Sequence, residues 1–265
     1  MGAPRLAPGE TRRLSRPRRR ALHMLPIPIY RESERHPQAQ ACAACEVRSA
    51  ALFGSLDDQG LDRIHTHIAS LSLEADKVVY DRGTSGLAVY TIRSGLVRFE
   101  RSTAQGGRRI VRLAGRGDLI GQEALLQRPY ADEAVSCTPV QLCRIPRSLV
   151  DDLAQGQGGL PRELMLRWQL ALDAAEAWLS ELSTGSARQR LLRLLLRLAD
   201  HADAQGVVWL PRREEIGAML DVTMETASRQ VSALKRDGVL TLVGGRSARV
   251  HLQVLQQCLQ AEDRA

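Results

Sequence analysis

The stretch Pro211–Lys235, PRREEIGAMLDVTMETASRQVSALK, decides the fold of the C-terminal part of the chain. Its apolar and small residues recur at helical spacing, which predicts the inward faces of two short helices. The inward positions are Ile216, Gly217 and Leu220 in the first helix and Ala227, Val231 and Leu234 in the second. Between them, we expect Val222 to fill the core and Thr223 to cap the second helix. The stretch therefore predicts a helix-turn-helix.

The second helix is expected to expose a polar face close to its N-terminus. The residues on this face are Glu225, Ser228, Arg229 and Ser232. An acid, an arginine and two hydroxyls at the start of a helix are suited to reading base edges in the major groove of DNA. Arg213 and Lys235 lie near the helix flanks, where basic side chains contact phosphates without specifying a sequence.

The residues that follow the two helices predict a β-hairpin wing. Strand-like runs at 239–241 and 249–252 are joined around Gly244-Gly245, and glycines between two such runs are typical of a hairpin connection. The alternative interpretation is an ordinary helical hairpin with a solvated charged face. Turn, spacing and wing together favour a DNA-binding domain.

Residues 56–153 have a different texture, with short apolar runs separated by glycines. Examples are Lys77–Tyr80, Ala88–Ile92, Leu96–Glu100 and Arg109–Leu113. Many short strands at intervals of about 8–12 residues predict a β-sandwich or a small barrel. Gly106-Gly107 lies between two of these runs and predicts a hairpin turn.

A long helix is predicted at 159–184 by an apolar stripe with alternating spacings of three and four. Its members are Met165, Trp168, Leu172, Ala175, Leu179 and Leu182. Such a seam usually pairs with a copy of itself, which predicts a two-fold homodimer. The alternative is packing of this helix on the barrel of its own chain. Ser183–Ser186 is then a break before a mostly apolar helix at Ala187–His201, which we expect to be buried.

Composition and charge exclude several classes of protein. The chain has 265 residues, of which 44% are hydrophobic and 25% charged, as in ordinary globular proteins. No apolar run approaches the roughly 20 residues of a membrane-spanning helix, and the N-terminus lacks the apolar core of a secretory signal. A cytoplasmic protein is therefore expected. Transmembrane proteins, secreted disulfide scaffolds and wholly disordered chains are excluded.

The net charge of +7 is concentrated at the N-terminus. Residues 1–35 contain nine arginines and three glutamates, which leaves a net charge of only +1 for the other 230 residues. A DNA-binding surface must then be a local patch. The tail has too few apolar residues to fold and is expected to be disordered. It is either a basic arm that attracts phosphate or, over residues 1–23, a segment upstream of the true start at Met24.

From Cys42 to Leu252, about four-fifths of the chain, the sequence resembles a family of bacterial transcription regulators. This family contains the cyclic-AMP receptor protein and the fumarate and nitrate reduction regulator, and is called Crp/Fnr. The barrel matches through Ile92–Gly95, Gly117–Gly121 and Cys143–Pro146, and the recognition helix through Glu225–Arg229, whose Glu-x-x-Ser-Arg pattern is that of the fumarate and nitrate branch. Asp221 and Gln230 depart from the usual glycine and apolar residue. Asp tolerates left-handed backbone, so the turn should survive.

The resemblance implies an α+β fold in three parts after the tail. A sensor domain at 36–158 would contain a jelly-roll β-barrel of the cyclic-nucleotide-binding kind. A dimerisation helix at 159–184 and a winged helix-turn-helix domain at 185–265 would follow. In the cyclic-AMP branch, a Gly-Glu motif and an Arg-Ser pair hold the nucleotide. Here the matching pairs are Gly121-Gln122 and Asp132-Glu133. Two carboxylates in place of a phosphate site make cyclic AMP an unfavourable ligand.

The oxygen-sensing branch holds a [4Fe–4S] cluster with four cysteines, and the resemblance places three of them here. Cys42, Cys45 and Cys143 match, whereas Ala51 stands at the position of another ligand. Cys137 is an alternative fourth thiol. A cluster with one non-cysteine ligand, a zinc ion, a regulatory disulfide and vestigial cysteines all remain open.

The sequence thus predicts a homodimeric DNA-binding regulator that responds to redox state or a gas through cysteines. The resemblance implies a palindrome similar to TTGAT-N4-ATCAA and contact with RNA polymerase. A small-molecule effector other than a cyclic nucleotide, or no effector, is the alternative for the barrel. A thiol–disulfide redox protein is the remote alternative, because the sequence shows no βαβ unit around Cys-x2-Cys. No catalytic motif is found, and we do not expect an enzyme.

Overall fold

The computed structural model describes residues 67–103, 106–156 and 160–264, together with Cys45, Val47, Leu52 and Ile64. All of these lie in one compact unit that covers 35–265. The expected basic tail at 1–35, Cys42 and Ala51 lie outside the described residues.

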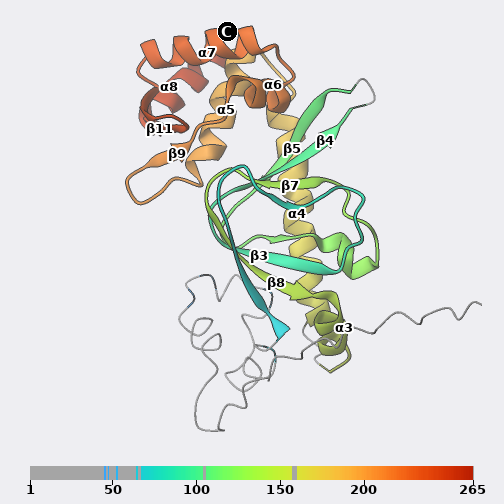
Figure 1. Cartoon of the computed structure of the whole chain (residues 1–265). Coiled ribbons are helices and arrows are strands. Elements are labelled where there is room, and N and C mark those ends of the chain that lie inside the picture. Colours follow the sequence, from blue (N-terminus) through green and yellow to red (C-terminus); the bar gives the residue numbers. More distant parts are fainter. Residues whose placement is uncertain are drawn as a thin grey trace, which may run out of the picture. The chain divides into compact units, whose positions relative to one another are not determined.

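The first half of the described chain forms two antiparallel four-stranded sheets (Figure 1). One sheet has the order β1-β8-β3-β6 and the other β2-β7-β4-β5. The strands are β1 (Ala69–Leu73), β2 (Val78–Tyr80), β3 (Ala88–Ser94), β4 (Val97–Ser102), β5 (Arg108–Ala114), β6 (Leu119–Ile120), β7 (Glu133–Ser136) and β8 (Val140–Pro146). Sequence neighbours are thus exchanged between sheets, which is the sandwich topology that the glycine-punctuated strands predicted.

Turn chemistry accounts for two of the strand connections. Gly106 has a φ of 78° in the turn between β4 and β5, where Thr103 accepts from Gly106 N at 3.0 Å. The predicted glycine hairpin is therefore confirmed. Gly95, between β3 and β4, has a φ of 89°, and a Cβ there would lie 2.3 Å from Pro139 O. A side chain at Gly95 would break the contact between two turns of the barrel.

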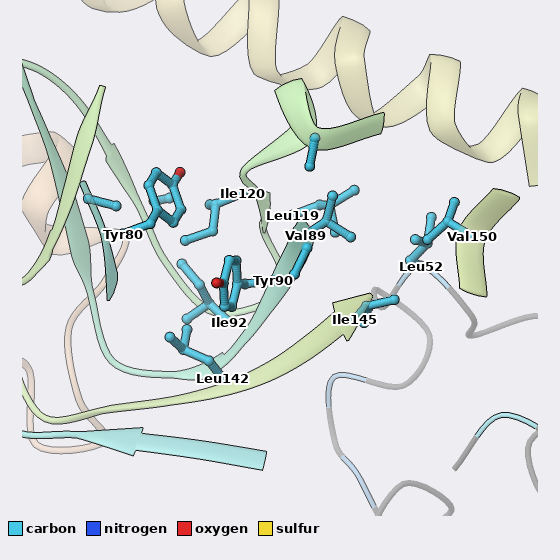
Figure 2. Packing of buried hydrophobic residues seen from close by; sticks show 14 of the residues in the cluster. Leu52, Tyr80, Val89, Tyr90, Ile92, Leu119, Ile120, Leu142, Ile145 and Val150 are labelled. Carbon is cyan, nitrogen blue, oxygen red and sulfur yellow. The ribbon is translucent and has the colours of Figure 1, made fainter. Parts of the chain in front are cut away.

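The barrel core is apolar and closely packed (Figure 2). Val89, Ile92, Ile120 and Leu142 are fully buried and come from β3, β6 and β8. The rings of Tyr80 and Tyr130 stack with centroids 4.0 Å apart, and the Tyr130 hydroxyl donates to Ala88 O at 2.7 Å. Because buried hydroxyls need a partner, this bond allows a tyrosine in the core.

Helices accompany the barrel. The 3-10 helix η3 (Gln122–Leu126) and helix α3 (Arg147–Gly156) are short, whereas α4 (Leu160–Leu182) has 23 residues. The predicted long helix is therefore present. Its first part packs on the barrel, where Leu160 is buried and Arg167 donates to Gly117 O at 3.2 Å.

The C-terminal part is a helical domain with a small sheet (Figure 1). Its elements are α5 (Ala187–Ala199), β9 (Val207–Trp209), α6 (Arg213–Leu220), α7 (Met224–Arg236), β10 (Leu240–Gly244), β11 (Ser247–Val250) and α8 (Leu252–Glu262). Helix α5 begins at a capping box between Ser186 and Gln189 and buries its leucines, as predicted.

The wing differs in detail from the sequence prediction. Strands β10 and β11 pair as expected, but β9 adds a third strand on the far side of β11. Leu252, which the sequence assigned to a wing strand, begins α8 instead. Its neighbour Leu255 is buried in the C-terminal core, and this burial fixes a helical rather than an extended segment. Among the described helices, none combines the length and apolarity needed to cross a membrane.

Candidate nucleic-acid interface and sensor region

The helix-turn-helix is formed by α6 and α7, and its turn follows the predicted chemistry. Asp221 adopts a left-handed φ of 56°, so the departure from glycine is tolerated as expected. A Cβ on Gly217 would lie 2.7 Å from Val222 O, which explains why this helix position is occupied by glycine. Thr223 caps α7 by accepting from Thr226 N at 3.2 Å.

The polar face of α7 is open. Glu225, Ser228, Arg229 and Ser232 are all exposed, while Ala227, Val231 and Leu234 on the opposite face are buried. Arg229 donates to the Thr226 hydroxyl at 3.2 Å. The pKa of Glu225 is lowered by hydrogen bonds from its own backbone N–H and from Thr223. An ionised acid and an arginine are therefore presented together to solvent.

The flanking basic residues differ in exposure. Lys235 is exposed, whereas Arg213 is half-buried and burial lowers its pKa, against a smaller opposing effect of Glu214. Arg236, which sequence reasoning did not select, is exposed beside Lys235 in the last turn of α7. The basic pair Lys235-Arg236 in the sequence was the available signal.

Helix α4 carries an exposed apolar stripe. Met165, Leu172 and Leu179 are 67%, 51% and 67% exposed, and Leu166 and Leu170 are also exposed, on another face of the helix. Ala175 is also exposed. The last predicted seam residue lies elsewhere, because Leu182 is 2% exposed and packs in the C-terminal core of its own chain.

A cavity of about 340 Å³ lies between the barrel and α4. It is lined by Arg101, Arg112, Gly121, Gln122, Glu123, Leu126, Ala131, Asp132, Trp168, Ala171, Leu172 and Ala175. Arg101 pairs with Asp132 at 2.7 Å, so this carboxylate is compensated by a cation. From the sequence, Asp132 and Glu133 were expected to repel a phosphate, and this pairing of Asp132 with Arg101 was not foreseen. Trp168, assigned to the dimer seam, lines the cavity.

Four of the five cysteines, Cys45, Cys137, Cys143 and Cys258, lie within the described residues. Cys143 lies half-buried on β8, opposite Ser70 and Thr91 in the two flanking strands. Cys45 is also half-buried, and Cys42 lies outside the described part. The described residues contain no group of three or more His, Cys, Asp or Glu that could hold a metal ion.

Cys137 has a different environment from Cys143. It is 2% exposed and packs with the C-terminal core, whereas Cys143 contacts the barrel core. Burial raises the pKa of the Cys137 thiol to about 12, although Arg98 acts in the opposite direction. A thiol that resists ionisation is a poor metal ligand and a poor nucleophile.

Comparison with known proteins agrees with this architecture. Residues 70–157 match the cyclic nucleotide-binding domain, and residues 189–257 match the Crp-like helix-turn-helix domain. The chain belongs to the Crp/Fnr family. This regulator is 28% identical to the transcriptional activator protein FnrL of Cereibacter sphaeroides over 234 residues, which cover 85% of this chain and 90% of that relative.

Two further similarities extend the comparison. An anaerobic regulatory protein of Haemophilus influenzae is 25% identical over 209 residues, covering 77% of this chain and 81% of that relative. The structure of FixK2 from Bradyrhizobium japonicum superposes with a TM-score of 0.64 at 26% identity, covering 72% of this chain and 96% of that one. This Crp/Fnr regulator is thus a DNA-binding transcription regulator, a class that is not enzymatic.

Proposed function

We propose that this regulator binds a palindromic DNA site as a homodimer and changes its activity with the redox state of its cysteines. The observation that carries the proposal is the exposed face of α7, which holds Glu225, Ser228 and Arg229 on one side of a capped helix. Its relatives include a protein named as an anaerobic regulator, which supports a redox input.

Each recognition residue has a role that follows from its chemistry. Arg229 forms bidentate hydrogen bonds with O6 and N7 of a guanine, and Glu225 accepts from an exocyclic amine of cytosine or adenine. Ser228 lies near a thymine. Lys235 and Arg213 contact phosphates and position the helix. The site is a palindrome similar to TTGAT-N4-ATCAA, with half-site centres about one helical turn apart.

The dimer forms through α4. Its exposed Met165, Leu172 and Leu179 give an apolar stripe that two copies bury against each other, with Ala175 allowing close approach. This pairing places the two α7 helices on the same side of the DNA. Contact with RNA polymerase follows from the proposed role in transcription.

Redox input is assigned to Cys42, Cys45 and Cys143. A [4Fe–4S] cluster needs four ligands that are usually thiolates, and this chain offers three, because the buried Cys137 packs in a different core from Cys143. The donor set therefore does not fit a four-cysteine cluster. We derive the response from the thiols themselves, with Cys42, Cys45 and Cys143 acting as one unit.

A second candidate input is a small polar effector. The cavity of about 340 Å³ beside α4 is lined by the Arg101–Asp132 pair, Arg112 and Glu123. An effector bound there contacts both the barrel and α4, so it can alter the dimer. Opposite charges within the cavity favour a ligand that itself carries both donors and acceptors.

The experiment compares DNA binding by anaerobically purified protein before and after oxidation, with iron, sulfide and zinc counted in the same samples. Cys42→Ser, Cys45→Ser and Cys143→Ser are each expected to abolish the same redox-dependent change. Cys258→Ser, on the last helix, is the matched control and should respond as the wild type does. Three independent, mild phenotypes would contradict the proposal that the cysteines act as one unit. An effector in the cavity beside α4 would then remain as the candidate input.

A further inference from the structure

The winged-helix domain packs directly on the barrel of the same chain. The C-terminal core includes the barrel residues Leu96, Ile110 and Cys137. At the turn after β5, the position that a Cβ of Gly115 would take lies 2.4 Å from Nδ1 of His201. The DNA-binding domain is therefore held by non-covalent contacts with the barrel as well as by the connecting segment Ser183–Ser186.

A first charged anchor surrounds Asp76, in the turn between β1 and β2. Its carboxylate accepts from Arg246 of the wing at 2.9 and 2.7 Å and from Arg212, just before α6, at 3.1 Å. A third arginine, the barrel's own Arg98, donates at 3.1 Å. Burial by itself raises the pKa of Asp76, but Arg246 and Arg98 lower it overall, so the anchor is ionised.

Arg246 extends this anchor into the helix-turn-helix. Its second guanidinium nitrogen bonds both oxygens of Glu215 at 2.8 and 2.6 Å. Glu215 is 1% exposed and also accepts from Arg212 N at 2.6 Å at the start of α6. Bidentate pairs fix direction as well as distance. The N-terminal end of α6 is thus tied to the barrel through Arg246 and Arg212.

A second anchor lies at the other end of α6. Arg109 on β5 pairs with Asp221, the left-handed residue in the turn that leads to the recognition helix. Helix α6 also packs against β5. Both ends of the first helix of the pair are therefore held by the barrel, and α7 follows α6 as a rigid continuation.

From this geometry we propose that Asp76 and Arg109 determine which half-site spacing the dimer accepts. The inference rests on the proposed function. Because α4 packs on the barrel, anchoring α6 to the same barrel fixes the distance and angle between the two recognition helices of a dimer. Neither residue touches DNA; each acts through the orientation of α6 and is a positioning residue.

The affinity gained by binding two half-sites at once sets the expected size of the spacing effect. Engaging a second half-site multiplies affinity by roughly 10²–10⁴ when the geometry allows it, and this gain is lost when the geometry forbids it. A rigid dimer should therefore reject a palindrome whose half-sites are moved apart. A dimer whose domains turn at Ser183–Ser186 can follow the displaced half-site and keeps much of the gain.

The test uses the full chain with both anchors removed from the barrel side, Asp76→Asn with Arg109→Gln. Asp76 has a φ of 60°, a conformation that asparagine adopts readily, so the turn is preserved. The matched control is Asp151→Asn, which breaks an ion pair with Arg147 inside α3. Probes are duplexes with two TTGAT-type half-sites at the natural spacing and with one or two base pairs inserted or deleted.

Wild type and Asp151→Asn should lose on the order of 100-fold in affinity when two base pairs are inserted. The double variant should lose about tenfold or less while its affinity for the natural spacing changes little. Amide exchange in α6 and β5, measured without DNA, should accelerate only in the double variant. An unchanged spacing profile or unchanged exchange in the double variant would overturn the inference. Wild-type protein that binds no duplex would overturn the proposed function instead, with exchange still reporting the anchors.

Discussion

Two groups of arginines in the winged-helix domain differ in what surrounds them. Arg229 on α7 is exposed and bonds a threonine hydroxyl one turn away. Arg246 in the wing stacks over the Trp209 ring at 5.1 Å and grips two carboxylates, Asp76 and Glu215. The same residue type is open to solvent in one place and holds the fold together in the other. Burial and partners, not residue type, decide between these roles.

The two arginines also differ in how far apart in the sequence their partners lie. The cap, the inward face and the outward face of α7 are all encoded within 13 residues of one segment. The anchor joins Asp76 and Arg246 across 170 residues. Sequence periodicity detects the first kind of feature and contains no signal for the second.

The largest effect is expected when the buried group of charges is broken. Arg98 is 5% exposed on its side chain and bonds Glu100 at 2.6 Å and Asp76 at 3.1 Å. Arg98→Ala removes the most buried cation of this group and leaves Glu100 with Arg108 and Asp76 with Arg246. It should lower the free energy of unfolding by about 3–4 kcal/mol, measured by urea denaturation. Arg236→Ala, on exposed α7, should change it by less than about 0.5 kcal/mol. Equal losses of stability in Arg98→Ala and Arg236→Ala would contradict the distinction between buried, paired arginines and exposed ones.

The exposed apolar stripe of α4 tests whether burial and partners also decide the role of uncharged side chains. Leu172 is 51% exposed in the single chain, and a dimer through α4 would bury it. Leu172→Glu places two like charges at the two-fold and should weaken the dimer by about 3 kcal/mol. Glu176→Gln, at an exposed polar position on the same helix, is the control. Sedimentation showing an intact Leu172→Glu dimer would refute pairing through this stripe.

The exposed arginine should affect recognition without affecting stability. Arg229→Ala should cost about 1–3 kcal/mol on the cognate site and relax the preference for guanine at one position. Arg213→Ala should weaken all sequences alike and flatten the salt dependence of binding. Selection from randomised half-sites distinguishes the two outcomes. An unchanged guanine preference in Arg229→Ala would mean that a different face of α7 enters the groove.

Physical reasons account for what the sequence predicted and what it did not. Alternating strands, the leucine-rich α5 and the cap at Thr223 depend on neighbours a few residues away, and all are present in the structure. Strand β9 has three residues, too few for periodicity to show. The Arg101–Asp132 pair joins β4 to the residue just before β7, 31 residues apart. The cavity therefore looked more negative in the sequence than it is in the fold. Helix α8 was missed although Leu255, Cys258 and Leu259 have helical spacing.

The smallest expected effect concerns His201, where the winged-helix domain meets the barrel. Burial lowers the pKa of His201 from its usual 6.5, against weaker opposing effects of Asp118 and Asp200. The unfolded chain therefore binds a proton more readily than the folded protein. Stability is complete above the unfolded pKa of 6.5 and falls as the pH drops below it toward the folded value.

His201→Gln removes this titration while keeping a polar side chain of similar size against Gly115. Between pH values of about 7.5 and 5.5, the urea midpoint of the wild type should therefore fall further than that of His201→Gln. Carboxylates titrate in both proteins, so the difference between the two slopes isolates the imidazole. Identical slopes would show that His201 gains its proton in the folded protein as readily as in the unfolded chain. The contact between Gly115 and His201, just after α5, would then be looser than the packing of the anchors around α6.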